Sequence, residues 1–227
     1  MTTSAAGIRT VGRHPSGVLL CAQLVVVLIY PFLDHTTAGR AVVGVVQMAV
    51  VLIAVWAVRS TPVLSWVAIV LGGPAMVLTI AEAISPETEA VVLASAAFHV
   101  PFYFFVSYAM VRYLFEDNVI TRDELYAVGA AFTVVAWAFA YVYAAAQVLW
   151  PGSFVGYSSP DASEDLLWFD LLYLSFTTLT SVGLSDIYPV RDHARSLVMV
   201  EQVAGILYVA LVIARFVGLA HARRPPG

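Results

Sequence analysis

Long apolar runs, separated by short polar breaks, constrain this chain of 227 residues more than any other feature. A helix needs roughly 20 mostly apolar residues to cross a hydrocarbon layer about 30 Å thick. Six runs approach or exceed that length: residues 17–33, 40–58, 62–84, 90–115, 123–149 and 195–219. Charged residues make up only 11% of the chain, against about 25% in soluble domains. We therefore predict an all-α polytopic membrane protein with six transmembrane helices, and we exclude a soluble enzyme.

The distribution of arginine predicts how the chain crosses the membrane. Every basic residue is an arginine, and basic residues gather in cytoplasmic loops. Eight fall on the side of the termini, at Arg9, Arg13, Arg59, Arg112, Arg122, Arg215, Arg223 and Arg224, and three on the other, at Arg40, Arg191 and Arg195. We expect an integral protein of the plasma (inner) membrane with both termini in the cytoplasm. Pro31, Asp34 and His35 stand where a signal peptide would need small residues, so the first run is predicted to be retained.

The remaining charges exclude several classes of partner and site. The net charge is −4, so no basic face is available to bind nucleic acid. Cys21 is the single cysteine, which excludes an intramolecular disulfide and a cysteine metal site. The outer loops carry six acids, Asp34, Glu87, Glu89, Asp161, Glu164 and Asp165. An acidic outer face of this kind attracts cations.

Residues 150–194 contain an apolar run that is too short to cross the membrane. The run covers residues 166–176 and follows a polar loop. Asp161, Ser163 or Glu164 is predicted to start it as a helix. The helix is predicted to stop within residues 177–181, because the hydroxyl and β-branched residues there favour extended backbone. We expect a re-entrant half-helix followed by a loop.

The loop after this half-helix runs from Ser181 to Pro189 and contains Gly183. Non-helical backbone at membrane depth is tolerated only where protein buries it or water reaches it. An extended loop in such a place makes its carbonyl oxygens available as cation ligands. The loop is therefore the leading candidate for a functional site.

Residues 177–186 read TTLTSVGLSD and resemble the T-x-x-T-T-V-G-Y-G-D pattern of the potassium-channel pore family. The resemblance covers about residues 120–219 and implies a pore domain of outer helix, pore helix, filter and inner helix. It indicates a bacterial-type subunit with one pore loop and four preceding helices. Gly205 matches an inner-helix glycine that the family uses as a hinge, although close packing explains such a glycine equally well.

The resemblance implies a homotetramer in the lipid membrane, because a fourfold ring of carbonyls needs four pore loops. Potassium ions, or other monovalent cations, would be its partners, and K+ in the filter its only bound metal, without any other cofactor. The implied ion ligands are Ser181, Val182, Gly183, Leu184 and Ser185. Support for the filter is expected from Asp186, Thr177, Thr178, Thr180, Tyr173, Trp168 and Glu201. Glu201 has two alternatives, a pair with Arg191 or Arg195 and a surface-facing position.

The filter sequence departs from the family at two main positions. Leu184 stands where the family has an aromatic residue, and it can pack on Tyr173 and Trp168 without donating a hydrogen bond. Ser185 replaces a glycine whose left-handed backbone costs another residue roughly 1–2 kcal/mol. Thr177 replaces a glutamate found in some members, so carboxylate-dependent inactivation is not expected. Potassium conduction is the first prediction, and weakly selective monovalent cation conduction is its alternative.

We divide the chain into a cytoplasmic segment (1–16), a four-helix transmembrane domain (17–119), a pore domain (120–219) and a short cytoplasmic tail (220–227). A voltage-sensing fourth helix needs several arginines, and this one carries only Arg112, so gating of that kind is not expected. The tail leaves no room for a ligand-sensing domain. Gating is expected at the filter, in the four-helix domain, or in the inner helix at Gly205, Ile206, Val209, Ile213 and Val217.

Isolated polar residues within the spans leave other functions open. His99 is interpreted either as a pH sensor or relay or as a histidine bonded to a carbonyl that Pro101 frees. Glu82 is expected to pair with Arg40 or to reach the headgroups. With the break at Gly72, Gly73 and Pro74, these residues permit a secondary transporter, although no repeat symmetry is visible. A membrane-embedded enzyme is the remaining alternative. The sequence contains no catalytic motif, so we do not expect an enzyme.

Overall fold

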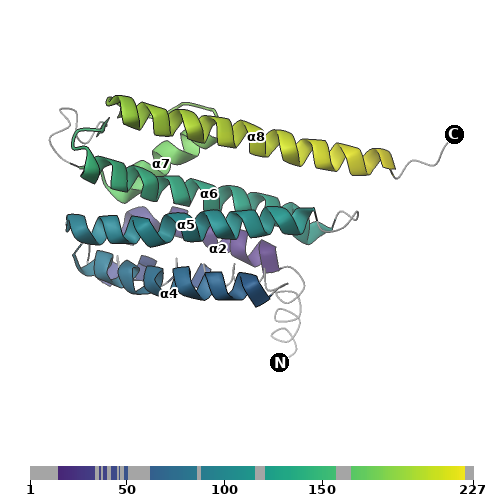
Figure 1. Cartoon of the computed structure of the whole chain (residues 1–227), viewed down its shortest axis with the longest axis horizontal. Coiled ribbons are helices and arrows are strands. Elements are labelled where there is room, and N and C mark those ends of the chain that lie inside the picture. The colour runs from purple at the N-terminus through teal and green to yellow at the C-terminus, as the bar shows by residue number, and fades with distance from the viewer. Residues whose placement is uncertain are drawn as a thin grey trace.

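The computed structural model describes residues 15–33, 36, 38–39, 42–44, 46, 49–50, 62–85, 88–115, 121–156 and 165–222. These residues are mostly helical (Figure 1). The named elements are α2 (Pro15–Leu33), α4 (Pro62–Ile84), α5 (Glu89–Leu114), α6 (Arg122–Leu149), β1 (Phe154–Val155), α7 (Trp168–Leu179), β2 (Tyr188–Pro189) and α8 (Asp192–Ala222). The prediction of a mostly helical chain is confirmed.

Four of these helices are long and apolar enough to cross a membrane: Pro15–Leu33, Glu89–Leu114, Arg122–Leu149 and Asp192–Leu219. Each coincides with a predicted span within a few residues. Within α4, the stretch Ile69–Ile84 is apolar but shorter. The predicted span at 40–58 lies largely outside the described residues, so the full number of six remains a prediction.

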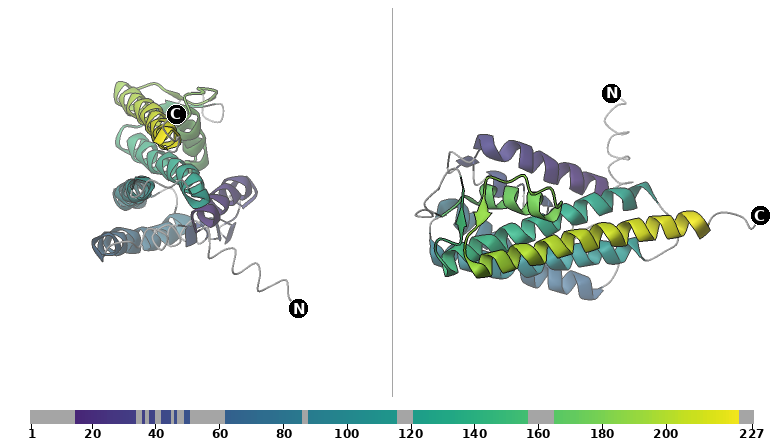
Figure 2. Two further views of the ribbon diagram at one scale, coloured as in Figure 1. Left: turned by 90° about the vertical axis from the view of Figure 1, so that its right-hand side faces the viewer. Right: turned by 90° about the horizontal axis from the view of Figure 1, so that it is seen from above.

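The long helices lie side by side, and α6 occupies the centre of the bundle (Figures 1 and 2). It packs against α2, α5, α7 and α8. Many of its buried residues are alanines, including Ala127, Ala130, Ala131, Ala138 and Ala140. Small side chains allow helix backbones to approach closely in a membrane. The alanine content of α6 therefore explains how one helix accommodates four neighbours.

The start of α6 is fixed by a capping box. The Thr121 hydroxyl accepts from the Glu124 N–H at 3.2 Å, and the Glu124 carboxylate accepts from the Thr121 N–H at 2.8 Å. The same carboxylate lies 3.8 Å from the Arg215 guanidinium of α8. That guanidinium also lies 4.9 Å from the ring centre of Phe115, just after α5. The first turn of α6 thus joins the end of α5 to the last part of α8.

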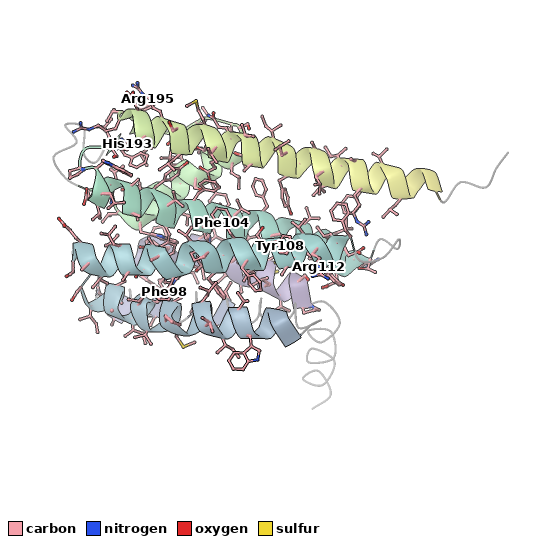
Figure 3. All side chains as sticks on the ribbon, viewed as in Figure 1. Phe98, Phe104, Tyr108, Arg112, His193 and Arg195 are labelled. Carbon is pink, nitrogen blue, oxygen red and sulfur yellow. The ribbon has the colours of Figure 1, made fainter. Side chains whose placement is uncertain are left out.

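Basic residues lie at both ends of the bundle. Arg112 lies near the end of α5, whereas His193 and Arg195 lie at the opposite end of the bundle, where α8 begins (Figure 3). The Ser16 hydroxyl of α2 donates to the Asp123 carboxylate of α6 at 2.8 Å. The start of α2 therefore lies at the same end of the bundle as Arg112 and the end of α8.

A small antiparallel sheet holds the loop after α6 against the segment before α8. Val155 pairs with Tyr188 and Phe154 with Pro189. Beside it, the Val190 N–H donates to the Ser153 carbonyl at 2.9 Å. These strands were not predicted from the sequence. They matter here because they fix one end of the loop that follows α7.

Candidate functional site

The half-helix α7 begins at Trp168, later than the sequence predicts. Asp161, Ser163 and Glu164 do not start it, so that prediction is wrong. Leu167 is the N-cap, with extended backbone and no side-chain cap hydrogen bond. The length of the apolar run predicted this helix correctly. The prediction of its first turn from polar capping residues was too early in the chain.

The late start has a physical cause in the Gln147 side chain of α6. Its amide nitrogen donates to the Leu166 carbonyl at 2.9 Å, and its amide oxygen accepts from the Leu166 N–H at 3.1 Å. Both backbone groups of Leu166 are therefore bonded outside a helix. This pair of bonds sets the point at which the chain enters α7.

The helix ends within the predicted stretch. It continues through Leu179 and its C-cap is Thr180, so residues 177–179 are still helical and the chain leaves the helix before Ser181. The Thr177 hydroxyl donates to the Leu174 carbonyl at 2.9 Å, and the Thr180 hydroxyl donates to the Phe176 carbonyl at 2.7 Å. Hydroxyl side chains can satisfy themselves against the preceding turn in this way. Residues 177–179 therefore remain helical and form the last turn of α7.

The inner half of the following loop, Ser181 to Gly183, is hydrogen-bonded to the last turn of α7. The Ser181 N–H donates to the Thr178 carbonyl at 2.9 Å, and the Gly183 N–H donates to the Thr177 carbonyl at 3.1 Å. Ser181 has φ 59° and Gly183 has φ 68°, which places both in the left-handed region. Such a conformation is free for glycine and costs serine roughly 1–2 kcal/mol.

The outer half of the loop, Leu184 to Asp186, is held differently. Ser185 does not have positive φ, so the prediction of a left-handed serine there is wrong, and the strained serine is Ser181. The Ser185 hydroxyl accepts from the Ile187 N–H at 3.1 Å. The Tyr173 hydroxyl of α7 donates to the Leu184 carbonyl at 2.6 Å. A side chain, rather than backbone geometry alone, therefore fixes this half.

The loop is open to the surroundings of the single subunit. Residues 181–184 are all exposed, with Val182 at 60% and Leu184 at 73%. Asp186 is exposed at the outer end of the loop. Residues 181–184 are therefore left uncovered by the rest of the subunit.

Trp168 lies away from the loop, in an aromatic cluster at the start of α7. Its ring centre is 5.6 Å from those of Tyr30 and Tyr141, and 6.4 Å from that of Trp137. Leu184 is 73% exposed on the single subunit, so its packing on Tyr173 and Trp168 stays a prediction. Trp168 attaches the start of α7 to α2 and α6.

Glu201 is fully buried between three helices. Its carboxyl oxygens are hydrogen-bonded to the Tyr143 hydroxyl of α6 and to the Ser175 hydroxyl of α7. Ser175 also lies 2.8 Å from the Ala136 carbonyl, and the Tyr143 hydroxyl interacts with the Thr178 side chain. One carboxyl of α8 thus connects to both other helices around the loop.

This position rules out the two alternatives for Glu201. A surface-facing carboxyl is wrong because the residue is buried. A pair with arginine is also wrong, because Arg195 lies 3.6 Å from Asp192 and Arg191 donates to the Pro151 carbonyl at 3.2 Å. Its partners Tyr143 and Ser175 were not predicted from the sequence. A hydroxyl residue inside each apolar run was the only available signal.

Gly205 packs directly against the end of α7. A Cβ atom added to it would lie 2.0 Å from the Leu179 carbonyl oxygen, far inside van der Waals contact. This close approach supports packing as the reason for glycine, and the hinge remains a prediction. Below it, four gate candidates are all exposed on the single subunit: Ile206, Val209, Ile213 and Val217. Their spacing places them along one face of α8.

His99 belongs to a satisfied polar cluster in the four-helix part. One ring nitrogen lies 3.1 Å from the Thr79 hydroxyl and the other 2.9 Å from the Ser95 carbonyl. The ring stacks on Tyr141, with centres 4.3 Å apart. This arrangement supports the carbonyl-bonded interpretation, with one correction. Pro101 frees the carbonyl four residues before it, at Ala97, whereas His99 bonds that of Ser95.

The other polar residues of the four-helix part also find local explanations. The Glu82 carboxyl interacts with the Tyr141 hydroxyl, and its predicted partner Arg40 lies outside the described residues. Helix α4 continues through Pro74. A Cβ added to Gly72 would lie 3.0 Å from the Phe102 ring, so this glycine serves close packing between α4 and α5.

Comparison with known proteins gives one family match. Residues 129–220 match a family model described as an ion channel. The matched segment contains most of α6, all of α7, the loop and nearly all of α8. No curated protein and no solved structure matches the chain. The match supports an ion channel family and an integral membrane protein that conducts ions passively, and it points away from an enzyme.

Proposed function

We propose, from the premise of an ion channel domain at residues 129–220, that four copies of this chain form a potassium-conducting pore. The observation that carries the proposal is the loop of residues 181–185, suspended from the end of a half-helix with its backbone uncovered. Backbone carbonyls in such a loop can replace the water shell of a dehydrated cation. The ligands would be the carbonyls of Ser181, Val182 and Gly183, with Leu184 and Ser185 completing the filter.

Assembly follows from the number of loops. Each chain supplies one, and a ring of carbonyls that surrounds an ion needs four. The exposed loop and the exposed apolar stripe on α8 would then face the fourfold axis. In that arrangement Ile206, Val209, Ile213 and Val217 would line the path below the filter. Lipid would cover the outer faces of α2, α4 and α5.

The pore helix contributes charge as well as support. The C-terminal end of a helix carries a partial negative charge, equivalent to about half an elementary charge. Helix α7 ends at Leu179, immediately before the loop. Four such ends would surround the cavity below the filter and favour a cation there. Asp186 and the acidic outer loops would raise the local cation concentration at the outer mouth.

Glu201 would act as a positioning residue for the filter. Its bonds reach Ser175 on α7 and Tyr143 on α6, so it joins the inner and outer helices to the helix that carries the loop. Voltage sensing by an arginine-rich helix is not part of the proposal, because α5 carries only Arg112. We also propose that the protein lies in the plasma membrane with both termini in the cytoplasm.

A second candidate is a weakly selective monovalent cation channel. The bond from Tyr173 to the Leu184 carbonyl and the backbone of Ser185 favour it, because both alter the outer filter. Discrimination between K+ and Na+ depends on the number and field strength of coordinating carbonyls. A filter with a changed outer half would discriminate less.

Reconstitution into planar bilayers tests both candidates. Single-channel steps should appear, with a reversal potential near the potassium value under opposed potassium and sodium gradients. A reversal near zero would favour the weakly selective channel, and the absence of steps would contradict a pore. Chemical crosslinking of the same preparation should stop at four subunits. A dimer as the largest species would remove the fourfold filter.

A further inference from the structure

We propose that Tyr173 sets the ion selectivity of this pore by withholding the Leu184 carbonyl from the ion path. The ladder of backbone ligands would then end at Gly183 on its outer side. The inference deepens the proposed function and rests on it, because it assumes that residues 181–185 form the filter. It assigns Tyr173 a role beyond the packing expected from the sequence.

The hydrogen bond from the Tyr173 hydroxyl determines where the Leu184 carbonyl points. Tyr173 lies on α7, the helix that supports the loop, and its hydroxyl oxygen is 2.6 Å from the Leu184 carbonyl oxygen. This distance is at the short end for a bond between a hydroxyl and a carbonyl. An acceptor oxygen faces its donor along a lone pair. The Leu184 carbonyl is therefore directed toward the pore helix.

The backbone conformation changes on either side of the Leu184 carbonyl. Left-handed residues at 181 and 183 are separated by Val182, whose φ is not positive. Alternation of this kind sends successive N–H groups to one side of the chain and leaves the carbonyls on the other. The alternation stops at Ser185, whose hydroxyl instead accepts from the Ile187 N–H at 3.1 Å. The regular ladder thus ends where Tyr173 takes hold.

The outer half of the loop has no polar side chain at position 184 to support it. The Leu184 side chain is 73% exposed and carries no polar group, so it cannot brace the outer loop. The Tyr173 hydroxyl of α7 supports the outer loop instead, by donating to the main-chain carbonyl of Leu184. A main-chain brace uses up a carbonyl that would otherwise face an ion. The brace therefore costs the pore one ring of ligands.

The experiment compares Tyr173→Phe with the unmodified channel under mixed potassium and sodium gradients. Loss of the hydroxyl should free the Leu184 carbonyl and lower the sodium-to-potassium permeability ratio at least threefold. Tyr208→Phe is the matched control. Its hydroxyl also donates to a backbone carbonyl at 2.6 Å, that of Val128, but lies away from the filter. An unchanged or higher ratio in Tyr173→Phe would overturn the inference.

A measurement on the unmodified protein decides the matter if Tyr173→Phe does not assemble. Isotope-edited infrared spectra would be recorded with a labelled carbonyl at Val182 or at Leu184, in potassium and then in sodium. The Val182 band should shift on exchange, and the Leu184 band should not. Equal shifts of both bands would overturn the role of Tyr173 alone. An unresponsive Val182 band would instead overturn the proposed filter.

Discussion

Two buried polar clusters, one around Glu201 and one around His99, satisfy buried polar groups in different ways. Around Glu201, a carboxyl from α8 bonds to hydroxyls of α6 and α7. Around His99, the ring bonds a carbonyl of its own helix and a hydroxyl of the neighbouring α4. The first cluster fixes a third element, the half-helix that carries the loop. The second joins α5 to α4 by a hydrogen bond and to α6 by ring stacking on Tyr141, and α5 already packs against both helices along its length.

The comparison teaches how to separate a functional polar residue from a packed one inside a membrane. Intramembrane ionisable residues are functional candidates by default. Here the useful criterion is what the bonds restrain. Glu201 restrains a helix of 12 residues that cannot cross the membrane alone, whereas His99 restrains helices that would stay in place without it. We therefore expect substitutions in the two clusters to differ in kind.

Replacing Glu201 should give the largest effect. In Glu201→Ala the buried Tyr143 hydroxyl loses its carboxyl acceptor, which costs about 1–3 kcal/mol, and α7 loses its tie to α8. We expect loss of current together with a lower dissociation temperature of the tetramer. Current is read in bilayers, and assembly by gel filtration after heating.

Glu82→Gln is the control, because it alters a carboxyl in the four-helix part and leaves the loop supports intact. Glu201→Gln should recover part of the assembly, since its amide keeps one acceptor oxygen. Equal losses in Glu201→Ala and Glu82→Gln would break the comparison between the clusters.

Replacing Gly205 by alanine should have an intermediate effect. The new methyl group would lie 2.0 Å from the Leu179 carbonyl oxygen, so α7 and α8 must separate, and overpacking of this kind costs about 1–3 kcal/mol. We expect reduced current and a lower dissociation temperature. Gly218→Ala is matched in chemistry and helix, and its Cβ would meet nothing within 4 Å. Similar behaviour of the two variants would argue that the close approach to α7 is unimportant.

Replacing His99 by leucine should give the smallest effect. Thr79 retains a bond to the Ala75 carbonyl at 2.9 Å, so the substitution leaves no hydroxyl of that residue unpaired. We expect a loss of about 1 kcal/mol in stability, with conductance and permeability ratio unchanged. Unitary current and reversal potential are the measurements. A changed permeability ratio in His99→Leu would move the four-helix cluster into the conduction machinery.

Apolar length was enough to predict where the described helices lie, including the half-helix that stops short of crossing. The cost of placing polar backbone in lipid makes that signal strong within a single run of residues. The start of α7 was misjudged, because bonds from Gln147, 19 residues before Leu166, decide where the helix begins. A side-chain amide bonded to a distant backbone leaves no periodic trace in the sequence.

The support of the loop was predicted only in part. Glu201 and Tyr173 were identified as residues near the filter, but their partners depend on how three helices pack. The strained serine was placed at 185 by analogy with a glycine, whereas the structure places positive φ at Ser181. The pairing of β1 with β2 joins segments more than 30 residues apart, and each strand has only two residues. Strands this short give no usable pattern of alternation.

The ion pair between Glu124 and Arg215 couples the last part of α8 to the first turn of α6. Both side chains are at most 9% exposed, and separating a buried pair leaves two uncompensated charges. The last turns of α8 therefore cannot swing outward alone at low cost. They must carry with them the first turn of α6 and the Phe115 ring beyond α5. In the proposed pore, widening at this end would therefore require α8 to move together with the start of α6 and the end of α5.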